Sequence, residues 1–240
     1  MLSKLFKPKL VNRWLLTIAG INGIKSPELL EWGDECWEML KACYNQPHRH
    51  YHNFDHIRDL LRKSDVVHVC FEDTTAVELA IWFHDSIYDP LSKFNEDASA
   101  QLAHSCIMKL GDEYKQLADK VSELIMFTKW SADTFKIESL DELKEHYPNA
   151  SMDYFYLRDM DWSGFGSKWS TFDNNNKNIR YEYSFICDYD YYTNRLKFLE
   201  MINSLERPLY STTWYDERIG DIAKYNILKE IKIVKCLLKI

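Results

Sequence analysis

The segment DTTAVELAIWFHDS, residues 73–86, decides the fold class of this chain. Between Ala76 and Phe83 every residue except Glu78 is apolar, so a helix here is apolar almost all round. Such a helix is stable only when other elements cover it on every side. We therefore expect it at the centre of a core, ending in the unusual pair His84-Asp85.

The helical period continues on both sides of this segment. Apolar residues recur at helical spacing after Asn53 and in the ranges 27–46, 95–109, 113–128, 179–204 and 216–239. Glycine (7) and proline (6) are scarce, which favours long helices over many short strands. No strand pattern, internal repeat or linker is evident. The sequence predicts an all-α fold: one domain over residues 1–240, an orthogonal helical assembly with about 25 peripheral residues at its N-terminus.

Two segments are less periodic than the rest. Residues 129–152 contain Pro148 and are expected to be irregular, with a short helix before Asp161. Residues 163–178 are polar and include three consecutive asparagines, Asn174 to Asn176. Asparagine favours turns over helix interiors, so this stretch is expected to form a loop or a flexible helix start.

The overall charge indicates which kinds of molecule the protein would not bind through electrostatic attraction. The net charge of −7 argues against broad binding to a nucleic-acid polymer. Lysines between apolar residues in 216–239 are interpreted as the solvated face of a packed helix, not as a membrane-surface helix.

No cysteine pair has C-x-x-C spacing, as expected for reduced thiols in the cytoplasm. We expect a cytoplasmic protein without a membrane partner, and leave an oligomer open.

The histidines indicate a metal site. His84 and Asp85 are adjacent, so their side chains diverge by about 100° on a helix and reach one ion only near the helix end. Further ligands must come from other helices, and His56 is the natural candidate. Imidazole and carboxylate together suit Mn, Fe, Co, Ni, Zn or Mg. His52 and His56 share a helix face, but without the glutamate of H-E-x-x-H they make no zincin motif.

Several short blocks occur together in a characteristic order. They are RHYHNFDHI (49–57), ELAIWFHDSIYDP (78–90), NEDASA (95–100), RDMDWSGFG (158–166) and IRYEY (179–183), followed by RPLY (207–210) and NILKE (226–230). In this order the chain resembles a predicted phosphohydrolase family of the HD superfamily, over roughly residues 27–232. The resemblance implies an HD-domain fold and hydrolase activity on a small phosphorylated metabolite such as a nucleotide.

The resemblance also implies roles for individual residues. The metal ligands would be His56, His84, Asp85 and Asp161, with Asp159 as an alternative to Asp161. They would hold one divalent ion, and a second ion is left open. The catalytic residues would be Asp85, His52 and Glu96. The substrate-binding residues would be Arg49, Tyr51, Asn53, Lys129 and Arg180.

One departure from the family pattern bears on activity. Members often carry a histidine three residues after the position of Thr128, where this chain has Ser131. This difference gives weight to a catalytically impaired HD-fold module that binds or senses a ligand. A di-iron oxygenase is a third alternative, and the missing histidine counts against it. Hydrolysis would need a divalent ion to activate water and neutralise phosphoryl charge.

Overall fold

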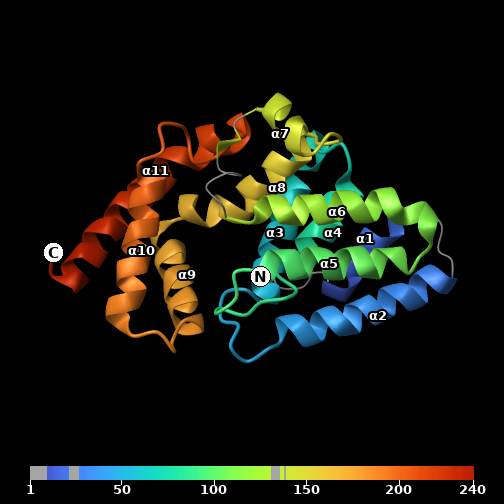
Figure 1. Cartoon of the computed structure of the whole chain (residues 1–240), viewed down its shortest axis with the longest axis horizontal. Coiled ribbons are helices and arrows are strands. Elements are labelled where there is room, and N and C mark those ends of the chain that lie inside the picture. The colour runs from blue at the N-terminus through green and yellow to red at the C-terminus, as the bar shows by residue number, and fades with distance from the viewer. Residues whose placement is uncertain (1–9, 22–26, 131–135, 138) are drawn as a thin grey trace, which may run out of the picture. The chain divides into compact units, whose positions relative to one another are not determined.

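The computed structural model describes residues 10–21, 27–130, 136–137 and 139–240, and in these ranges it contains helices and no strand (Figure 1). The all-α prediction is therefore confirmed for the described residues. The structure gives no test of the finer prediction of an HD-domain arrangement, which stays a prediction.

The chain divides into two compact units. Unit 1 comprises residues 1–46 and 52–157, and unit 2 comprises residues 47–51 and 158–240. Unit 1 contains α1 (Leu10–Ala19), α2 (Pro27–Tyr44), α3 (Phe54–Val67), α4 (Thr74–Phe83), α5 (Asn95–Met108), α6 (Lys115–Thr128), α7 (Leu140–His146) and the start of α8 (Met152–Trp162). Unit 2 contains the end of α8, then α9 (Trp169–Glu182), α10 (Asp188–Asn203) and α11 (Thr213–Leu238). The prediction of one domain over the chain stays a prediction.

Helix α4 is the centre of the unit 1 core, as its sequence predicts. Every residue from Ala76 to Phe83 is buried, and all but Glu78 are 0% exposed. The neighbours that pack against α4 include α1, α3, α5 and α6, and α5 and α6 lie side by side (Figure 1). Asp73 caps the start of α4, because its carboxylate accepts a hydrogen bond from the Ala76 N–H at 2.9 Å. This core fixes the place where α4 ends.

Helix α1 departs from the peripheral place that the sequence predicts for the first 25 residues. Trp14 is 0% exposed and its ring packs edge-on against Trp82 of α4, with centroids 5.6 Å apart. The indole N–H of Trp14 also donates to the Gly33 carbonyl at 2.7 Å. An indole buries a large apolar area once its N–H has an acceptor. Tertiary packing therefore places α1 in the core.

Glu78 is the one carboxylate on α4, and it should make folding pH-dependent. Burial raises the pKa of this carboxyl above its ordinary value of 4.5, while the Thr17 hydroxyl at 2.7 Å and the Arg13 guanidinium partly offset the rise. The folded state then holds the proton more tightly than the unfolded state. The stabilisation present below pH 4.5 is therefore lost as the pH rises through the higher folded pKa.

We expect the variant Glu78→Gln to remove this pH dependence, because glutamine does not titrate. Urea unfolding at a series of pH values between about 4 and 7 would measure it. The wild-type free energy of unfolding should fall more steeply over this range than that of the variant. Parallel curves would contradict the assignment.

The polar stretch 163–178, expected to be a loop or a flexible helix start, is mostly helical, so the loop alternative is wrong. Ser163–Gly166 form a short 3-10 helix, and α9 begins at Trp169, so Asn174 to Asn176 lie inside a helix. Tertiary contacts compensate for the low helix propensity of asparagine: Phe172 is buried, and Asn176 accepts a hydrogen bond from Arg195 at 3.0 Å. A sequence pattern cannot reveal partners so far away along the chain.

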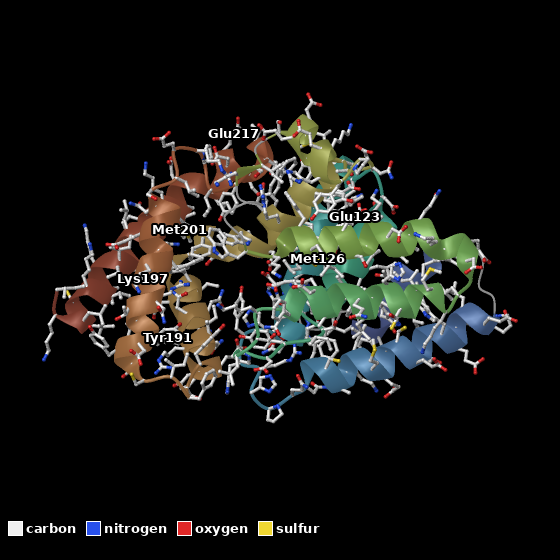
Figure 2. The ribbon with its side chains drawn as sticks, in the orientation of Figure 1. Glu123, Met126, Tyr191, Lys197, Met201 and Glu217 are labelled. Atoms are coloured by element: carbon white, nitrogen blue, oxygen red, sulfur yellow. The ribbon has the colours of Figure 1, made fainter. Side chains whose placement is uncertain are left out.

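The predicted helix 179–204 is divided into α9 and α10. The turn between them is held by Arg180, whose guanidinium donates to the carbonyls of Tyr183 at 2.6 Å and Ile186 at 2.8 Å. The same group pairs with Asp188 at 2.7 Å and lies over the ring of Tyr191. Tyr191 is on α10 (Figure 2). Carbonyl groups at a helix end need donors, and this arginine supplies them.

Helix α11 packs beside α10 in unit 2 (Figure 1). Among the helices in the described ranges, none combines the length and the apolar content that crossing a bilayer requires.

Candidate metal centre

Helix α3 supplies the first histidine of the site. Asn53 caps this helix as the sequence predicts, because its side-chain oxygen accepts the Asp55 N–H at 2.8 Å. The cap places His56 in the first turn, where the residue is 7% exposed. Helices α3 and α4 pack against each other, so His56 meets the end of α4.

The end of α4 supplies the adjacent pair. The helix stops at Phe83, so His84 is the residue directly after it and Asp85 follows. Adjacent side chains can both reach one ion only at a helix end, and the pair lies at such an end. His84 is 2% exposed and the side chain of Asp85 is 15% exposed.

Three donor atoms of unit 1 form a small triangle. Nε2 of His56 lies 3.2 Å from Nε2 of His84, and Oδ2 of Asp85 lies 3.0 Å from Nε2 of His84. The third side, from Nε2 of His56 to Oδ2 of Asp85, is 3.6 Å. Side chains from two helices thus converge on one small volume.

The proton on His84 is fixed by the backbone. Its Nδ1 lies 3.0 Å from the carbonyl oxygen of Ile81, which can only accept a hydrogen bond. In the neutral ring the proton is therefore on Nδ1, and Nε2 keeps its lone pair for another partner. Metal-binding histidines are commonly oriented in this way.

Asp85 is held in its anionic form. Burial acts to raise the pKa of this carboxyl, but in the absence of a metal ion the attraction to the protonated rings of His84, His52 and His56, with a hydrogen bond from His84, outweighs burial. The pKa of Asp85 therefore lies well below its ordinary value. A carboxylate that stays charged is available as a ligand across the physiological pH range.

The two candidate aspartates of the fourth ligand position both belong to unit 2. Asp161 is in the last turn of α8. The alternative, Asp159, is engaged within its own unit: it accepts hydrogen bonds from the Ser211 N–H at 2.9 Å and the Thr212 N–H at 2.7 Å. These bonds occupy Asp159, and Asp161 stays the predicted ligand of the two.

The donor set fits a divalent ion. Nitrogen and oxygen ligands lie about 2.0–2.2 Å from such an ion, so two neighbouring donors are about 2.8–3.6 Å apart, depending on whether the geometry is octahedral or tetrahedral. The separations of 3.0, 3.2 and 3.6 Å among His56, His84 and Asp85 agree closely with this spacing. Imidazole and carboxylate donors together favour borderline and hard divalent ions over ions that prefer sulfur.

His52 lies beside this group in unit 1. Its ring stacks on Tyr88 with centroids 4.2 Å apart, and the centroids of His52 and His56 are 6.2 Å apart. Glu96 is in the first turn of α5, where it is half-buried. The structure therefore gives His52 a fixed ring position near the metal ligands.

The candidate substrate residues are dispersed over the two units. In unit 1, Asn53 caps α3, and Lys129 pairs with Asp97 and lies 5.6 Å from the centroid of the Phe94 ring. In unit 2, Arg49 is 6% exposed and Arg180 holds the turn after α9.

Tyr51 is also in unit 2, where its hydroxyl lies beside Gly164. The difference at Ser131 lies outside the described residues.

Sequence reasoning missed three groups that shape the site or its candidate substrate segment. They are the Ile81 carbonyl, the Tyr88 ring and the Glu182 carboxylate. A carbonyl is present at every residue, so no sequence pattern could single out Ile81. Tyr88 and Glu182 lie within the family-like blocks 78–90 and 179–183, which was the available signal.

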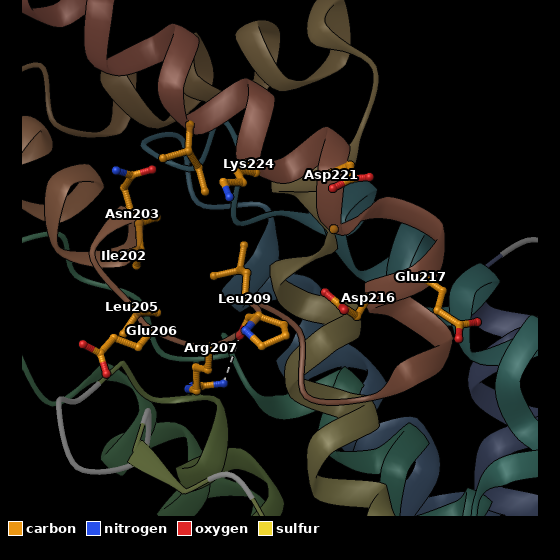
Figure 3. Close-up of a pocket in the computed structure, with 13 residues that line it drawn as sticks. Ile202, Asn203, Leu205, Glu206, Arg207, Leu209, Asp216, Glu217, Asp221 and Lys224 are labelled. Atoms are coloured by element: carbon orange, nitrogen blue, oxygen red, sulfur yellow. Dashed lines mark hydrogen bonds between the residues drawn. The ribbon is translucent and has the colours of Figure 1, made fainter.

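Unit 2 has a cavity of about 500 Å³ of its own (Figure 3). Its walls come from the end of α10, the segment after it and the first half of α11. They are formed by Ile202, Asn203, Leu205, Glu206, Arg207, Pro208, Leu209, Asp216, Glu217, Gly220, Asp221, Lys224 and Ile227. None of the candidate ligands lines it, so its size alone gives no reason to place the chemistry there.

Comparison with known proteins identified no relative: no protein-family model, curated protein or solved structure matches the chain. What characterises the site is therefore its own geometry and the resemblance seen in the sequence.

Proposed function

We propose that this protein is a metal-dependent phosphohydrolase acting on a small phosphorylated metabolite such as a nucleotide. The observation that carries the proposal is the triangle of donor atoms from His56, His84 and Asp85. In the neutral His84 ring the proton is on Nδ1, so Nε2 can bind a metal ion. Asp161, the last aspartate of the family-like pattern, would be the fourth ligand. The resemblance to HD phosphohydrolases supports the same ligand set.

The bound ion would supply Lewis-acid chemistry, neutralising phosphoryl charge and lowering the pKa of water. His56, His84, Asp85 and Asp161 would hold it. We assign proton transfer with the substrate to His52, whose ring is fixed by stacking on Tyr88. Glu96 remains a second candidate for this role.

Cationic side chains would meet the phosphate. Arg49 is the better candidate, because a guanidinium can bind two phosphate oxygens at once. Lys129 would have to exchange its contact with Asp97 for the substrate. The donors of Arg180 are occupied by Tyr183, Ile186 and Asp188, which favours a structural role for this residue.

The first experiment is metal analysis of the protein as purified and after incubation with Mn, Fe, Co, Ni, Zn or Mg salts. We expect about one ion per chain in the wild type, and its loss in both His84→Ala and Asp161→Ala. The wild type loaded with that ion should then release phosphate from at least one member of a nucleotide and sugar-phosphate panel.

Two outcomes would redirect the proposal. Failure of every ion to bind would overturn metal-dependent hydrolysis and leave an HD-fold module that binds or senses a ligand. Stoichiometric metal without turnover of any phosphate ester would also support the impaired module, in agreement with the difference at Ser131.

A further inference from the structure

Glu182, the last residue of α9, is a buried carboxylate in unit 2. The residue is only 3% exposed, although glutamate is almost never fully buried without partners. Its Oε1 accepts hydrogen bonds from two consecutive backbone N–H groups, those of His50 at 2.8 Å and Tyr51 at 2.7 Å. Glu182 thus holds the backbone of the segment 47–51, which belongs to the same unit.

Neighbouring contacts reinforce this attachment. The ring of Tyr181 lies against the ring of His50, with centroids 5.5 Å apart. The hydroxyl of Tyr51 lies 3.5 Å from the position that a Cβ on Gly164 would occupy. The segment 47–51 is therefore fixed through its backbone and through two of its side chains.

The physical effect of Glu182 is to remove conformational freedom from a short segment. Hydrogen bonds from backbone N–H groups to a charged carboxylate are stronger than those to a neutral acceptor. The N–H groups of His50 and Tyr51 both point at one carboxylate oxygen. The backbone dihedral angles of His50, which separate these two groups, are therefore restricted. With the backbone held in this way, the Cα–Cβ bonds of the neighbouring residues Arg49 and Tyr51 point in fixed directions.

We propose that Glu182 is a positioning residue for a phosphorylated ligand, because it holds the backbone from which Arg49 and Tyr51 extend. The inference depends on the proposed function, in which Arg49 meets the phosphate. A binding group held in advance loses less freedom when the ligand arrives, so affinity rises without any new contact.

Two substitutions separate positioning from folding. Glu182→Ala removes the acceptor and frees both N–H groups. Glu182→Gln keeps a side-chain oxygen that can accept hydrogen bonds from both N–H groups. We expect the alanine variant to bind inorganic phosphate about 10-fold more weakly, and the glutamine variant to recover most of this loss. Glu200→Ala is the matched control, since the carboxylate of Glu200 pairs with Lys235 and its side chain is 47% exposed.

The experiment has two arms, both on the full chain loaded with its metal ion. Nuclear magnetic resonance would measure hydrogen exchange at the His50 and Tyr51 amides, and calorimetric titration would measure the dissociation constant of inorganic phosphate. Metal content and the unfolding midpoint would be compared in every variant. Support requires faster exchange at both amides and weaker phosphate binding in Glu182→Ala, with recovery in Glu182→Gln.

Several results would overturn the inference. These are unchanged amide exchange in Glu182→Ala, unchanged phosphate affinity in that variant, or a wild type that binds no phosphate. Neither arm needs turnover, so the proposed function can fail separately. A wild type that binds phosphate but hydrolyses no ester would reject phosphohydrolase activity and leave the Glu182 comparison intact.

Discussion

The variant His84→Ala should lose its bound metal ion and with it the phosphatase activity. His84 contributes Nε2, which lies 3.2 Å from Nε2 of His56 and 3.0 Å from Oδ2 of Asp85. Loss of a group that merely orients a ligand costs about 10–100-fold in metal affinity, so loss of a ligand should cost at least about 100-fold. Turnover should fall by about 10³-fold, since stabilisation of the transition state by the ion is worth several kcal/mol.

Metal titration of the apoprotein and phosphate release at saturating substrate would measure the two effects. His104→Ala is the matched control, because His104 also lies beside a carboxylate, Asp119 at 3.1 Å, but on the surface of α5 and α6. It should retain metal and activity. A His84→Ala protein with wild-type metal affinity and an unchanged unfolding midpoint would remove His84 from the ligand set.

The candidate site could be located from the sequence because its residue types are rare in such surroundings. A histidine and an aspartate directly after the almost wholly apolar helix α4 cost free energy to bury unless they have partners. The pairing of His56 with His84 follows from the packing of α3 against α4. The hydrogen bond from His84 to the Ile81 carbonyl could not be predicted, because it depends on a rotamer at the helix end.

The helices could be predicted where one apolar face repeats, and less well where distant residues decide. The central place of α4 follows from its composition, since a helix apolar all round has no other stable environment. The helix through Asn174–Asn176 depends on Arg195 and a buried Phe172, which local propensity does not reveal. The core position of Trp14 depends on Trp82 and Gly33, which are equally remote in sequence.

A second group of buried contacts in unit 1 lies around the start of α8. Glu123 lies on α6 (Figure 2). It accepts a hydrogen bond from the Tyr154 hydroxyl at 2.6 Å, and burial together with this bond raises the pKa of Tyr154. Next to Tyr154, the carboxylate of Asp153 is 0% exposed. Asp153 accepts the backbone N–H groups of Glu72 at 2.8 Å and Asp73 at 3.0 Å.

Asp153 therefore anchors the backbone at which the central helix α4 begins. Lys120 adds its ammonium group at 3.3 Å, so the buried charge has an opposite partner. We expect Asp153→Ala to lower the free energy of unfolding by about 3–5 kcal/mol, because it leaves two amides without their acceptor and removes the nearer of the two carboxylates that pair with Lys120, the other being Asp73 at 3.8 Å. Urea unfolding of the metal-free protein would measure the loss without a contribution from metal binding.

The variant Asp119→Ala tests whether the burial of Asp153 is the reason for the expected loss of stability in Asp153→Ala. Asp119 also accepts from a lysine, Lys115, and from His104, yet its side chain is 41% exposed. Exposed ion pairs contribute about 0–1 kcal/mol, so this variant should unfold almost as the wild type does. Equal losses in Asp119→Ala and Asp153→Ala would show that the anchoring of the α4 start is not what Asp153 contributes. A large loss confined to Asp153→Ala would tie the stability of unit 1 to the same helix that ends at His84.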